Sequence, residues 1–334
     1  MHQTHVPVVT VIIVNWNGKR LLQECLESLA NQTYRNFSIV VVDNGSVDGS
    51  VEWLKQQFLN VHVISLDKNY GFCLANNIAL KDVRSEYAAL LNNDAMPQKD
   101  WLARLVAAME KNSAAGFATS RFLYYDQPDT IDRAGDGYTR AGVATLRGRG
   151  ENARHYDHTE WIFGACGGAS IYRMRMLKEI GYFDPDFFLI HEDVDLSFRA
   201  QLRGYRCLYV HDAVVLHHAS SSIGHDSPVS VYYGHRNLEW VYLKNMPAGL
   251  IAKTLAPHIM YVMAAFLFFL IRGQIRTFLR AKRDALKGWR HVVRQRQVIQ
   301  KTKGVSDRYL WDLFEKERLI PRLRHRLTKR RESC

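Results

Sequence analysis

The sequence predicts an α/β fold in which helices flank a mostly parallel sheet. Runs rich in β-branched residues alternate with segments whose apolar side chains recur at helical spacing. The expected elements of the first hundred residues are strands at 8–14, 37–42, 61–66 and 87–91 and helices at 19–30, 51–58 and 74–83. This alternation is typical of right-handed βαβ units, which bring the carboxyl ends of the strands to one edge of a sheet.

Beyond residue 100 the order of elements is less regular. Residues 124–160 are polar, rich in Gly and Arg and without periodicity, so we expect a long loop there. Further elements are expected at 161–172, at 175–180 and 192–201 as helices, and at 207–216 as a last strand. We expect one large α/β domain at 1–245 and a helical, basic C-terminal region at 246–334.

The net charge of +12 is concentrated at the end of the chain. Residues 272–334 hold 20 Lys and Arg against 6 Asp and Glu, whereas the rest of the chain holds 25 against 27. Just before them, the apolar run 255–271 contains Pro257 and is shorter than the about 20 apolar residues of a spanning helix. We therefore expect a helix that lies on an anionic membrane surface, with a single span less favoured. The alternative is a buried helix followed by a solvated basic extension.

Composition also indicates the compartment and the partners. Trp289 and Trp311 lie among the basic residues at helical spacing, which is typical of an amphipathic surface helix rather than a nucleic-acid-binding segment. The five cysteines show neither disulfide nor metal spacing, and the N-terminus lacks a signal-peptide pattern. We expect a cytoplasmic protein, peripheral on the inner face of the cell membrane, with no nucleic-acid partner.

Polar side chains follow the first two predicted strands. Asn15 and Trp16 come after the first strand, and Asp43 comes at the end of the second. Open α/β sheets bind nucleotides at this edge, where Asp43 suits a base or ribose that donates hydrogen bonds and Trp16 suits base stacking. Taken alone, Asp43 equally fits a turn or helix cap, and Trp16 equally fits core packing.

A second polar group ends the fourth predicted strand. Asn92 and Asp94 are two residues apart, so their oxygens can point to one side of an extended chain and bind Mg²⁺ or Mn²⁺. His217, at the end of the last strand, is a further candidate ligand through a neutral imidazole. The alternative is a polar strand end and a structural histidine.

The densest acidic cluster is Glu192, Asp193 and Asp195, at the start of a predicted helix. Acids in a first turn favour the helix dipole, but their mutual repulsion also raises at least one pKa, which suits a general base. Motifs for other chemistries are absent: there is no P-loop, GxSxG or HExxH, and the GxGxxA at 148–153 follows no predicted strand.

Seven short motifs occur in order along the chain: VIIVNWNG (11–18), VVDNGS (41–46), NYGF with ANN (69–77), LNND (91–94), FGACGGA (163–169), HEDVDL (191–196) and VVLH (214–217). Together they resemble the motifs of family 2 glycosyltransferases of the GT-A fold, in particular the bacterial rhamnosyltransferase-like branch. The similarity covers roughly residues 8–245 and implies a Rossmann-like α/β catalytic domain.

The resemblance implies an inverting sugar transfer from a nucleotide-diphospho-sugar, with Asp193 as the base that deprotonates the acceptor hydroxyl. Asp94 and His217 stand at the family's metal-ligand positions, so Mg²⁺ or Mn²⁺ is implied. The implied donor-binding positions are Asn15, Trp16, Asp43, Asn69, Gly71, Asn77 and Asn92. Those beside the acceptor or supporting the base are Gly164, Ala165, Glu192, Asp195 and Arg199.

The chain departs from the family's DxD motif at Asn92, so its metal site carries less charge. The QxxRW motif of processive synthases is absent, and a single addition is expected. The branch implies dTDP-rhamnose as donor, although the quoted residues do not separate rhamnose from galactofuranose, glucose or N-acetylglucosamine. The basic C-terminal region favours a polyprenyl-diphosphate-linked glycan acceptor, as in cell-surface polysaccharide assembly. A nucleotidyltransferase and a non-catalytic lipid-binding scaffold are the alternatives from other classes.

Overall fold

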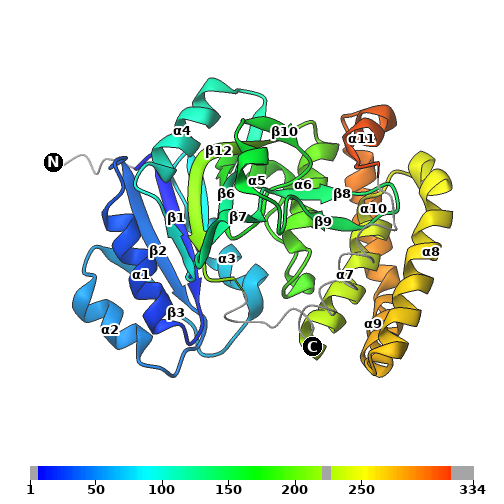
Figure 1. Cartoon of the computed structure of the whole chain (residues 1–334), viewed down its shortest axis with the longest axis horizontal. Helices are drawn as coiled ribbons and strands as arrows, with labels where there is room; N and C mark the ends of the chain where they lie inside the picture. Colours follow the sequence, from blue (N-terminus) through cyan, green and yellow to red (C-terminus); the bar gives the residue numbers. More distant parts are fainter. Residues whose placement is uncertain (1–6, 220–226, 317–334) are drawn as a thin grey trace.

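Four parallel strands form one half of the central sheet in the computed structural model, which describes residues 7–219 and 227–316 (Figure 1). They are β1 (Val9–Asn15), β2 (Phe37–Asp43), β3 (Val61–Ser65) and β4 (Tyr87–Asn92). Their order in the sheet is β4-β1-β2-β3. The predicted alternation of strands and helices is confirmed, and the parallel register places the four carboxyl ends at one edge.

The other half of the sheet is mixed. Its strands are β5 (Ala95–Pro97), β6 (Ala115–Tyr124), β7 (Gln127–Arg133), β10 (Glu160–Ile162), β11 (Ala169–Arg173) and β12 (Arg206–His217). β12 is parallel to β6, but β11 lies antiparallel between β4 and β6. The predicted α/β fold with a central sheet flanked by helices is confirmed, although β11 is antiparallel to both of its neighbours. The chain enters β11 at the edge where β4 ends, with the Asn92 N–H bonded to the Gly168 carbonyl at 2.7 Å.

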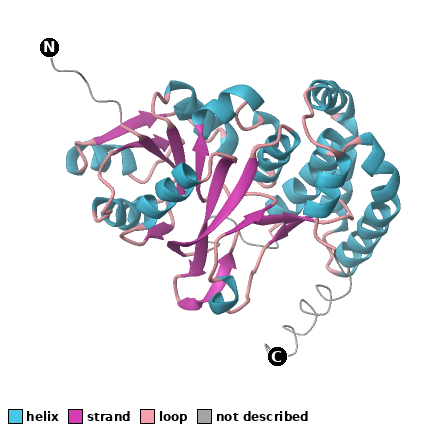
Figure 2. Ribbon diagram, turned by 90° about the horizontal axis from the view of Figure 1, so that it is seen from above, coloured by secondary structure: helices cyan, strands magenta, loops and turns pink. Residues whose placement is uncertain are grey.

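Helices cover both faces of the sheet (Figure 2). On one face lie α1 (Lys19–Ala30), α2 (Ser50–Gln57) and α4 (Trp101–Lys111), and on the other lie α3 (Gly71–Asp82), α5 (Met174–Ile180) and α6 (Glu192–Leu202). Side chains of β1 alternate between two cores, since Val11 and Ile13 contact the first group and Ile12 the second. Strands buried on both faces explain why the sequence shows continuous apolar runs there.

The segment 124–160 is more ordered than its composition predicts. Beside the whole of β7 it contains the hairpin of β8 (Asp136–Tyr138) and β9 (Ala144–Leu146) and a short helix, η1 (Ala153–Tyr156). Ion pairs stabilise it, because Arg149 pairs with Asp132 and Arg147 pairs with Glu160. The expectation of a loop was wrong for a physical reason: paired polar groups are buried here, and hydrophobic periodicity does not register them.

In the described part of the chain, five helices follow the sheet and gather at one end of the molecule (Figures 1 and 2). They are α7 (Pro228–Asn245), α8 (Ala248–Ile271), α9 (Ile275–Lys287), α10 (Trp289–Lys301) and α11 (Asp307–Leu313). α7 packs on α6, and both α9 and α10 pack on α7. After α11 the chain returns to the sheet, where Phe314 is buried against the rings of Tyr138, Phe163 and Phe198. The expected boundary between residues 245 and 246 falls between α7 and α8.

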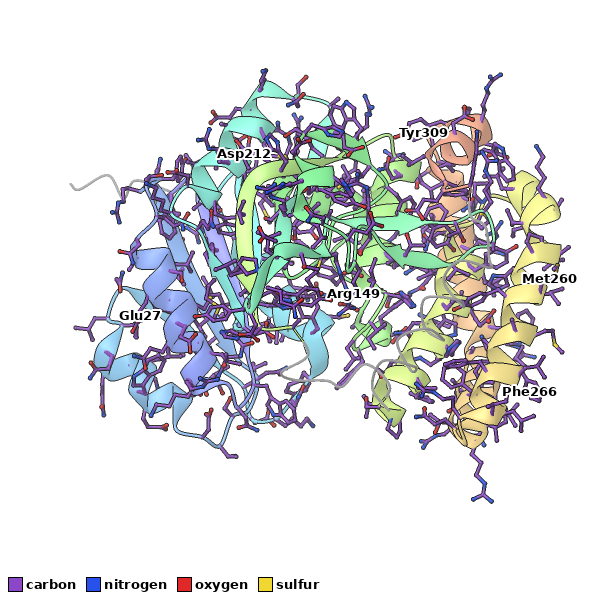
Figure 3. The ribbon with its side chains drawn as sticks, in the orientation of Figure 1. Glu27, Arg149, Asp212, Met260, Phe266 and Tyr309 are labelled. Carbon is purple, nitrogen blue, oxygen red and sulfur yellow. The ribbon has the colours of Figure 1, made fainter. Side chains whose placement is uncertain are left out.

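α8 is longer than the apolar run in the sequence suggests. It has 24 residues, continues through Pro257, and among the described residues is the one helix long and apolar enough to cross a membrane. The expectation that this segment is too short for a span was therefore wrong, because residues 248–254 also join the helix. Only 22% of its apolar 18-residue stretch is buried. The exposed side chain of Met260 points away from the molecule (Figure 3). Residues 317–334 of the predicted basic region lie outside the described residues.

Candidate active site

Asn15 and Asp43 end neighbouring parallel strands and are partners in the register of β1 and β2. Asn15 Nδ2 donates to Asp43 Oδ2 at 3.0 Å, and the backbone N–H of Ser46 donates to Asp43 Oδ1 at 2.9 Å. Asn93 Nδ2 donates to Asn15 Oδ1 at 2.9 Å, which links the end of β4 to this pair. A carboxylate has about four acceptor sites, so Asp43 retains capacity for a ligand at the sheet edge.

The turn before α3 carries two more of the predicted donor positions. Asn69 Oδ1 accepts from the Gly71 N–H at 2.8 Å and from Asn44 Nδ2 at 3.0 Å. Gly71 has a φ of +80°, and a Cβ there would lie 2.5 Å from the Phe188 ring. Trp16 lies after β1 with 49% of its surface exposed. Asn69 and Gly71 therefore shape a turn, whereas Trp16 offers an open ring face.

Asn77 lies inside the protein, where it braces the chain. Its Nδ2 donates to the Phe183 carbonyl at 2.7 Å, and its Oδ1 accepts from the Phe183 N–H at 3.1 Å. Because the backbone of Phe183 uses both ends of this amide, the structure does not support the prediction that Asn77 contacts the donor. The pair instead fixes α3 to the segment that leads into η2 (Pro185–Phe187).

The predicted metal ligands Asp94 and His217 are brought together by β5 and β12. His217 Nε2 lies 3.2 Å from Asp94 Oδ1, and His217 Nδ1 lies 2.8 Å from Asp132 Oδ2. Asn92 ends β4, two residues before Asp94. Its amide packs closely on Gly168, because a Cβ added to Gly168 would lie 2.9 Å from Asn92 Nδ2. The site thus has a third charged member, Asp132, that the sequence analysis did not identify.

Charge pairing dominates this group. Burial alone would lower the pKa of His217, but hydrogen bonds to Asp132 and Asp94 raise it to about 9. Burial alone would raise the pKa of Asp132, but His217 and Arg149 lower it to about 2. Each carboxylate therefore shares a proton of the imidazolium ring, and the ring is charged at neutral pH.

The donor set fits a divalent cation in part. Among the described residues, no group of three or more His, Cys, Asp or Glu side chains is arranged to hold a metal ion. Asp94 and His217 nevertheless place an oxygen and a nitrogen 3.2 Å apart, at a point where a cation would replace the shared proton. Mg²⁺ is usually bound by one or two carboxylates, with water and substrate phosphate completing its shell.

Asp193 lies in the first turn of α6, opposite β7. Its Oδ2 accepts from the Gly167 N–H at 3.2 Å and lies 3.6 Å from an Arg133 guanidinium nitrogen. The same nitrogen lies 3.6 Å from Asp136 Oδ1. Burial, and then the charge of Asp193, raises the pKa of Asp136 well above its usual range. Of the two carboxylates, the Asp193 side chain is 11% exposed and the Asp136 side chain 2%, so Asp193 is the more exposed and the better candidate for contact with a substrate hydroxyl.

The residues predicted to lie beside the acceptor connect the β8 segment to α6. The backbone of Gly164 bonds to that of Asp136 in both directions, at 2.8 and 3.0 Å. The Ala165 N–H donates to Ser197 Oγ of α6 at 3.2 Å. Glu192 is buried, and burial raises its pKa well above the usual range. These contacts place the β8 segment and α6 side by side.

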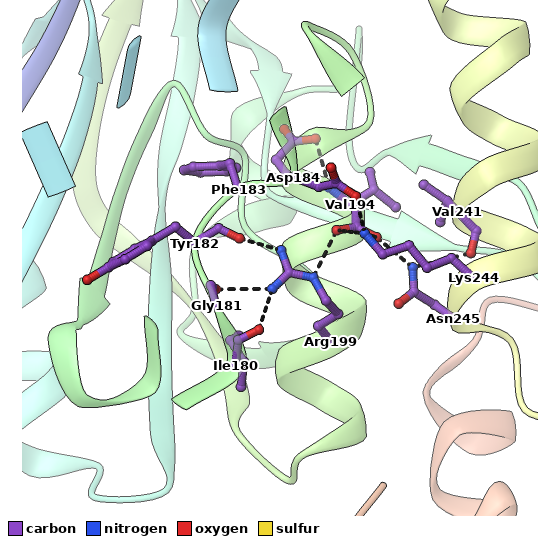
Figure 4. A network of polar contacts seen from close by, with 12 residues as sticks. Ile180, Gly181, Tyr182, Phe183, Asp184, Val194, Arg199, Val241, Lys244 and Asn245 are labelled. Carbon is purple, nitrogen blue, oxygen red and sulfur yellow. Dashed lines mark hydrogen bonds and ion pairs between the residues drawn. The ribbon is translucent and has the colours of Figure 1, made fainter. Parts of the chain in front are cut away.

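Asp195 and Arg199 belong to a buried ionic network (Figure 4). Asp195 is fully buried and accepts from Arg199 Nε at 2.9 Å and Asn245 Nδ2 at 2.8 Å. Lys244 Nζ lies 3.0 Å from Asp195 and 2.6 Å from Asp184. Burial alone would raise the pKa of Asp195, but Lys244 and Arg199 lower it below its usual value. The network joins α6 to α7, so both residues orient the helix that carries the candidate base.

The loop that leads into α6 is strained. Phe188, Ile190 and His191 have φ angles of 62°, 65° and 71°, and such a conformation costs about 1–3 kcal/mol at each non-glycine residue. Asn237 of α7 is fully buried, and its Nδ2 donates to the carbonyls of Leu189 at 2.8 Å and Ile190 at 2.7 Å. The sequence analysis did not identify Asn237, because a lone amide within a helix carries no motif.

Three further site residues escaped the sequence analysis. Asp132 and Arg133 end β7 and Asp136 begins β8, in the segment expected to be a loop. Their signal in the sequence is the dense alternation of Asp and Arg directly after Ile131. Charges of opposite sign that follow an apolar residue so closely are compatible with a paired, buried cluster as well as with a solvated loop.

Carboxylates from separate strands and helices thus converge at the carboxyl edge of the sheet, where α/β enzymes of the transferase class place their active sites. The family model "Glycosyl transferase family 2" matches residues 10–181, just over half of the chain. The protein belongs to glycosyltransferase family 2, and the predictions of family and of enzyme class are confirmed.

Similarity to individual proteins agrees with this assignment. The N-acetylglucosaminyl-diphospho-decaprenol L-rhamnosyltransferase of Mycobacterium tuberculosis is 24% identical over 308 residues, which cover 84% of this chain and 98% of that protein. An uncharacterized protein of Sinorhizobium fredii is 29% identical over 234 residues, but the chain spans only 25% of its length. The mannosyltransferase PcManGT of Pyrobaculum calidifontis, solved with GDP-Man and Mn²⁺, has a TM-score of 0.54 at 18% identity, over 93% of this chain and 84% of that chain. This last likeness concerns the fold alone.

Proposed function

We propose that this glycosyltransferase moves L-rhamnose from dTDP-rhamnose to a polyprenyl-diphosphate-linked glycan acceptor, with inversion at the anomeric carbon. One observation carries the inverting chemistry: Asp193 is the accessible carboxylate beside Arg133, whereas its neighbour Asp136 is covered. A direct displacement needs one base, unlike the carboxylate pair of most glycosidases. The choice of sugar and acceptor is supported by the mycobacterial relative, which aligns over nearly its whole length.

In the proposed reaction, Asp193 Oδ2 accepts the proton of an acceptor hydroxyl while that oxygen forms a bond to the anomeric carbon. The bond from this carbon to the diphosphate oxygen breaks, and the nucleoside diphosphate leaves. Arg133, 3.6 Å from Asp193, holds the carboxylate in position. Asp43 and Asn15 bind the nucleoside, and the Trp16 ring covers its base.

A divalent cation, Mg²⁺ or Mn²⁺, is part of the proposal. Asp94 and His217 would bind it, and it would offset the charge of the leaving diphosphate. Asn92 in place of a carboxylate lowers the negative charge of the site, so phosphate oxygens would supply more of the coordination. The structural neighbour PcManGT was solved in complex with GDP-Man and Mn²⁺, which supports a divalent cation in this proposal.

We also propose that the protein lies on the inner face of the cell membrane through the outer face of α8. Its exposed apolar side chains include Leu255, Ile259, Met260, Met263, Leu267, Leu270 and Ile271. Exposed basic residues flank them at Lys253, Arg276 and Arg283. An apolar stripe with basic neighbours suits an anionic leaflet, where each cation adds about 1 kcal/mol.

Membrane binding is tested with point variants of the whole chain. We expect the double variant Met263→Glu/Leu267→Glu to lose co-sedimentation with phosphatidylglycerol vesicles, because it places two charges where the acyl chains would lie. Leu59→Glu, at an 86% exposed residue between α2 and β3, is the matched control and should bind like wild type. Equal vesicle binding by the double variant and wild type would contradict the proposal.

Activity is tested by offering the protein a panel of nucleotide sugars, with and without a polyprenyl-diphosphate-linked acceptor and Mg²⁺ or Mn²⁺. We expect acceptor-dependent dTDP release from dTDP-rhamnose. Asp193→Asn should lower kcat by about 10²–10⁴-fold, the usual contribution of a general base. Asp157→Asn, at a side chain that is 72% exposed, is the control and should leave kcat unchanged.

The same assay distinguishes the alternatives. Turnover with another donor would keep the transferase and replace rhamnose by another hexose or by galactofuranose. Pyrophosphate release from a nucleoside triphosphate and a sugar phosphate would indicate a nucleotidyltransferase instead. Lipid binding that Asp193→Asn leaves intact, without turnover of any donor, would indicate a scaffold.

A further inference from the structure

A cavity of about 160 Å³ lies between the loop that leads into α6 and the C-terminal helices. Gly234 and Leu238 of α7 form one wall, Tyr261 and Phe269 of α8 form another, and His191 closes the side toward the sheet. His191 precedes the candidate base Asp193 by two residues. The cavity is therefore bounded by the catalytic loop on one side and by the candidate membrane helix on the other.

The lining of the cavity is mixed in polarity. Leu238 and Phe269 contribute apolar surface, whereas Ser230, His191 and His235 contribute groups that donate or accept hydrogen bonds. A cavity left by imperfect core packing is apolar and stays dry. Binding sites for small molecules, in contrast, combine apolar walls with a few polar groups that orient the ligand. The chemistry of this lining suits an amphipathic ligand.

The position of the cavity indicates how such a ligand would be oriented. Its polar groups include His191, at the end nearest the base, while Phe269 belongs to the helix whose outer face carries exposed Leu267 and Leu270. A ligand with a sugar head and an apolar chain would place the head near Asp193 and the chain along α8. The reverse orientation would place apolar atoms against the charged groups around Arg133.

We propose that this cavity between α7, α8 and the loop before α6 is the acceptor channel, which takes the junction between the glycan head and the isoprenoid chain of a lipid-linked acceptor. The proposal rests on the proposed transferase function and specifies where its acceptor binds. It predicts that filling the cavity hinders an acceptor with a long apolar chain more than an acceptor that carries the same sugar on a short chain.

Gly234 offers a clean way to fill the cavity. A Cβ built on Gly234 has no neighbouring atom within 4 Å, and no positive φ restricts the residue. A side chain at this position therefore starts in open space, and replacing a helical glycine also favours the helix. Val229, which is 49% exposed on the same helix and does not line the cavity, accepts the same substitution as a matched control.

The experiment compares Gly234→Phe, Val229→Phe and wild type as full chains. Equal Tm values are first confirmed, so that differences in activity do not reflect unfolding. For an acceptor with a decaprenyl-length chain we expect Gly234→Phe to lower kcat/KM at least about tenfold, through KM, because the channel is blocked. A farnesyl-chain acceptor with the same sugar should lose much less, and Val229→Phe should behave like wild type. Equal losses for the two acceptors, or no loss for either, would overturn the proposal.

A binding readout separates failure of the channel from failure of the proposed function. Calorimetric titration with N-acetylglucosaminyl-diphospho-decaprenol needs no donor and no turnover. Binding by wild type and Val229→Phe, but markedly weaker binding by Gly234→Phe, would support the channel even if rhamnose proved to be the wrong sugar. Indistinguishable titrations of Gly234→Phe and wild type, or no heat from either, would reject the channel while leaving any measured transfer in place.

Discussion

Asn237 Nδ2 of α7 donates to the carbonyl oxygen of Ile190 at 2.7 Å. Ile190 lies 47 positions earlier in the chain, in the loop that leads into α6. Ile190 is β-branched and has a φ of 65°, a conformation that such residues avoid. The amide of Asn237 thus stabilises a backbone shape that the loop would not adopt by itself. Because this loop leads directly into Asp193, the contact couples α7 to the candidate base.

Asn237→Asp tests that coupling with an isosteric change. The carboxylate cannot donate to the Leu189 and Ile190 carbonyls, so we expect the free energy of unfolding to fall by about 1–3 kcal/mol. We also expect kcat to fall about tenfold or more with the donor KM little changed, since a 1 Å displacement of a catalytic group is costly. Asn112→Asp, whose amide caps α4 at Ala108, is the control. A kcat equal to wild type would mean that the loop keeps its shape without Asn237.

Lys244 is the central cation of the network in Figure 4. Replacing it with Met preserves much of the side-chain volume but leaves Asp184 and Asp195 buried without their shared partner. Removing one member of a buried ion pair costs about 3–5 kcal/mol, and we expect urea denaturation to show a loss of this size. Lys253→Met, at an exposed lysine of α8, should change stability little. Similar midpoints for the two variants would show that α7 does not depend on this charge.

Glu239 makes the attachment of α8 and α9 sensitive to acid. It contacts Lys282 of α9 and lies 3.2 Å from His258 Nε2 of α8. Burial alone would raise its pKa, but His258 and Lys282 lower it from 4.5 to about 2. Its stabilising contribution is therefore present above pH 4.5 and is lost as the pH falls toward 2, up to about 3 kcal/mol in total.

The measurement is urea denaturation at pH 5 and pH 3 for wild type and Glu239→Gln. We expect the variant to be less stable at pH 5 and to lose less stability between the two pH values than wild type. Glu27→Gln, on the exposed side of α1, should follow the wild-type curve. Parallel curves for Glu239→Gln and wild type would contradict the assignment of this acid response to Glu239.

Cation binding is tested through Asp94. A saturating mixture of Mn²⁺ and dTDP should raise the Tm of wild type, because a ligand at 100 times its Kd stabilises by about 2.7 kcal/mol. Asp94→Asn removes the ligand charge, so we expect most of the Mn²⁺-dependent part of the shift to disappear, whereas Asp129→Asn at an exposed residue of β7 should retain it. A chelator should reverse the wild-type shift. A shift that is independent of Mn²⁺ would argue against a metal at this position.

Much of the fold was predictable because the relevant signals are local. Strands such as β1 and β2 are continuous β-branched runs, and α1 shows apolar residues at helical spacing. Asn15 ends β1, Asp43 ends β2 and Asp94 follows β4. The residues at this edge of the sheet could therefore be predicted from the order of the elements. The direction of β11 did not follow, because strand direction depends on where the chain re-enters the sheet.

The other half of the site depends on partners that are distant in sequence. Asp132 is recognisable as a site residue only when His217, 85 positions later, lies 2.8 Å away. Arg133 becomes meaningful only between Asp136 and Asp193. A charged residue in a segment without periodicity has the same local signature whether it is solvated or paired, and tertiary contacts alone distinguish the two cases.

Phe314 has a consequence for biosynthesis. The rings that it covers, Tyr138, Phe163 and Phe198, flank the backbone of the Asp136 and Gly164 pair. On the ribosome these rings are made long before Phe314 emerges, and α8 emerges between the two events. With the membrane binding proposed above, the nascent enzyme would meet the lipid surface before Phe314 covers these rings. Protease protection of the sheet in ribosome-bound chains should accordingly appear only once residue 315 has left the exit tunnel.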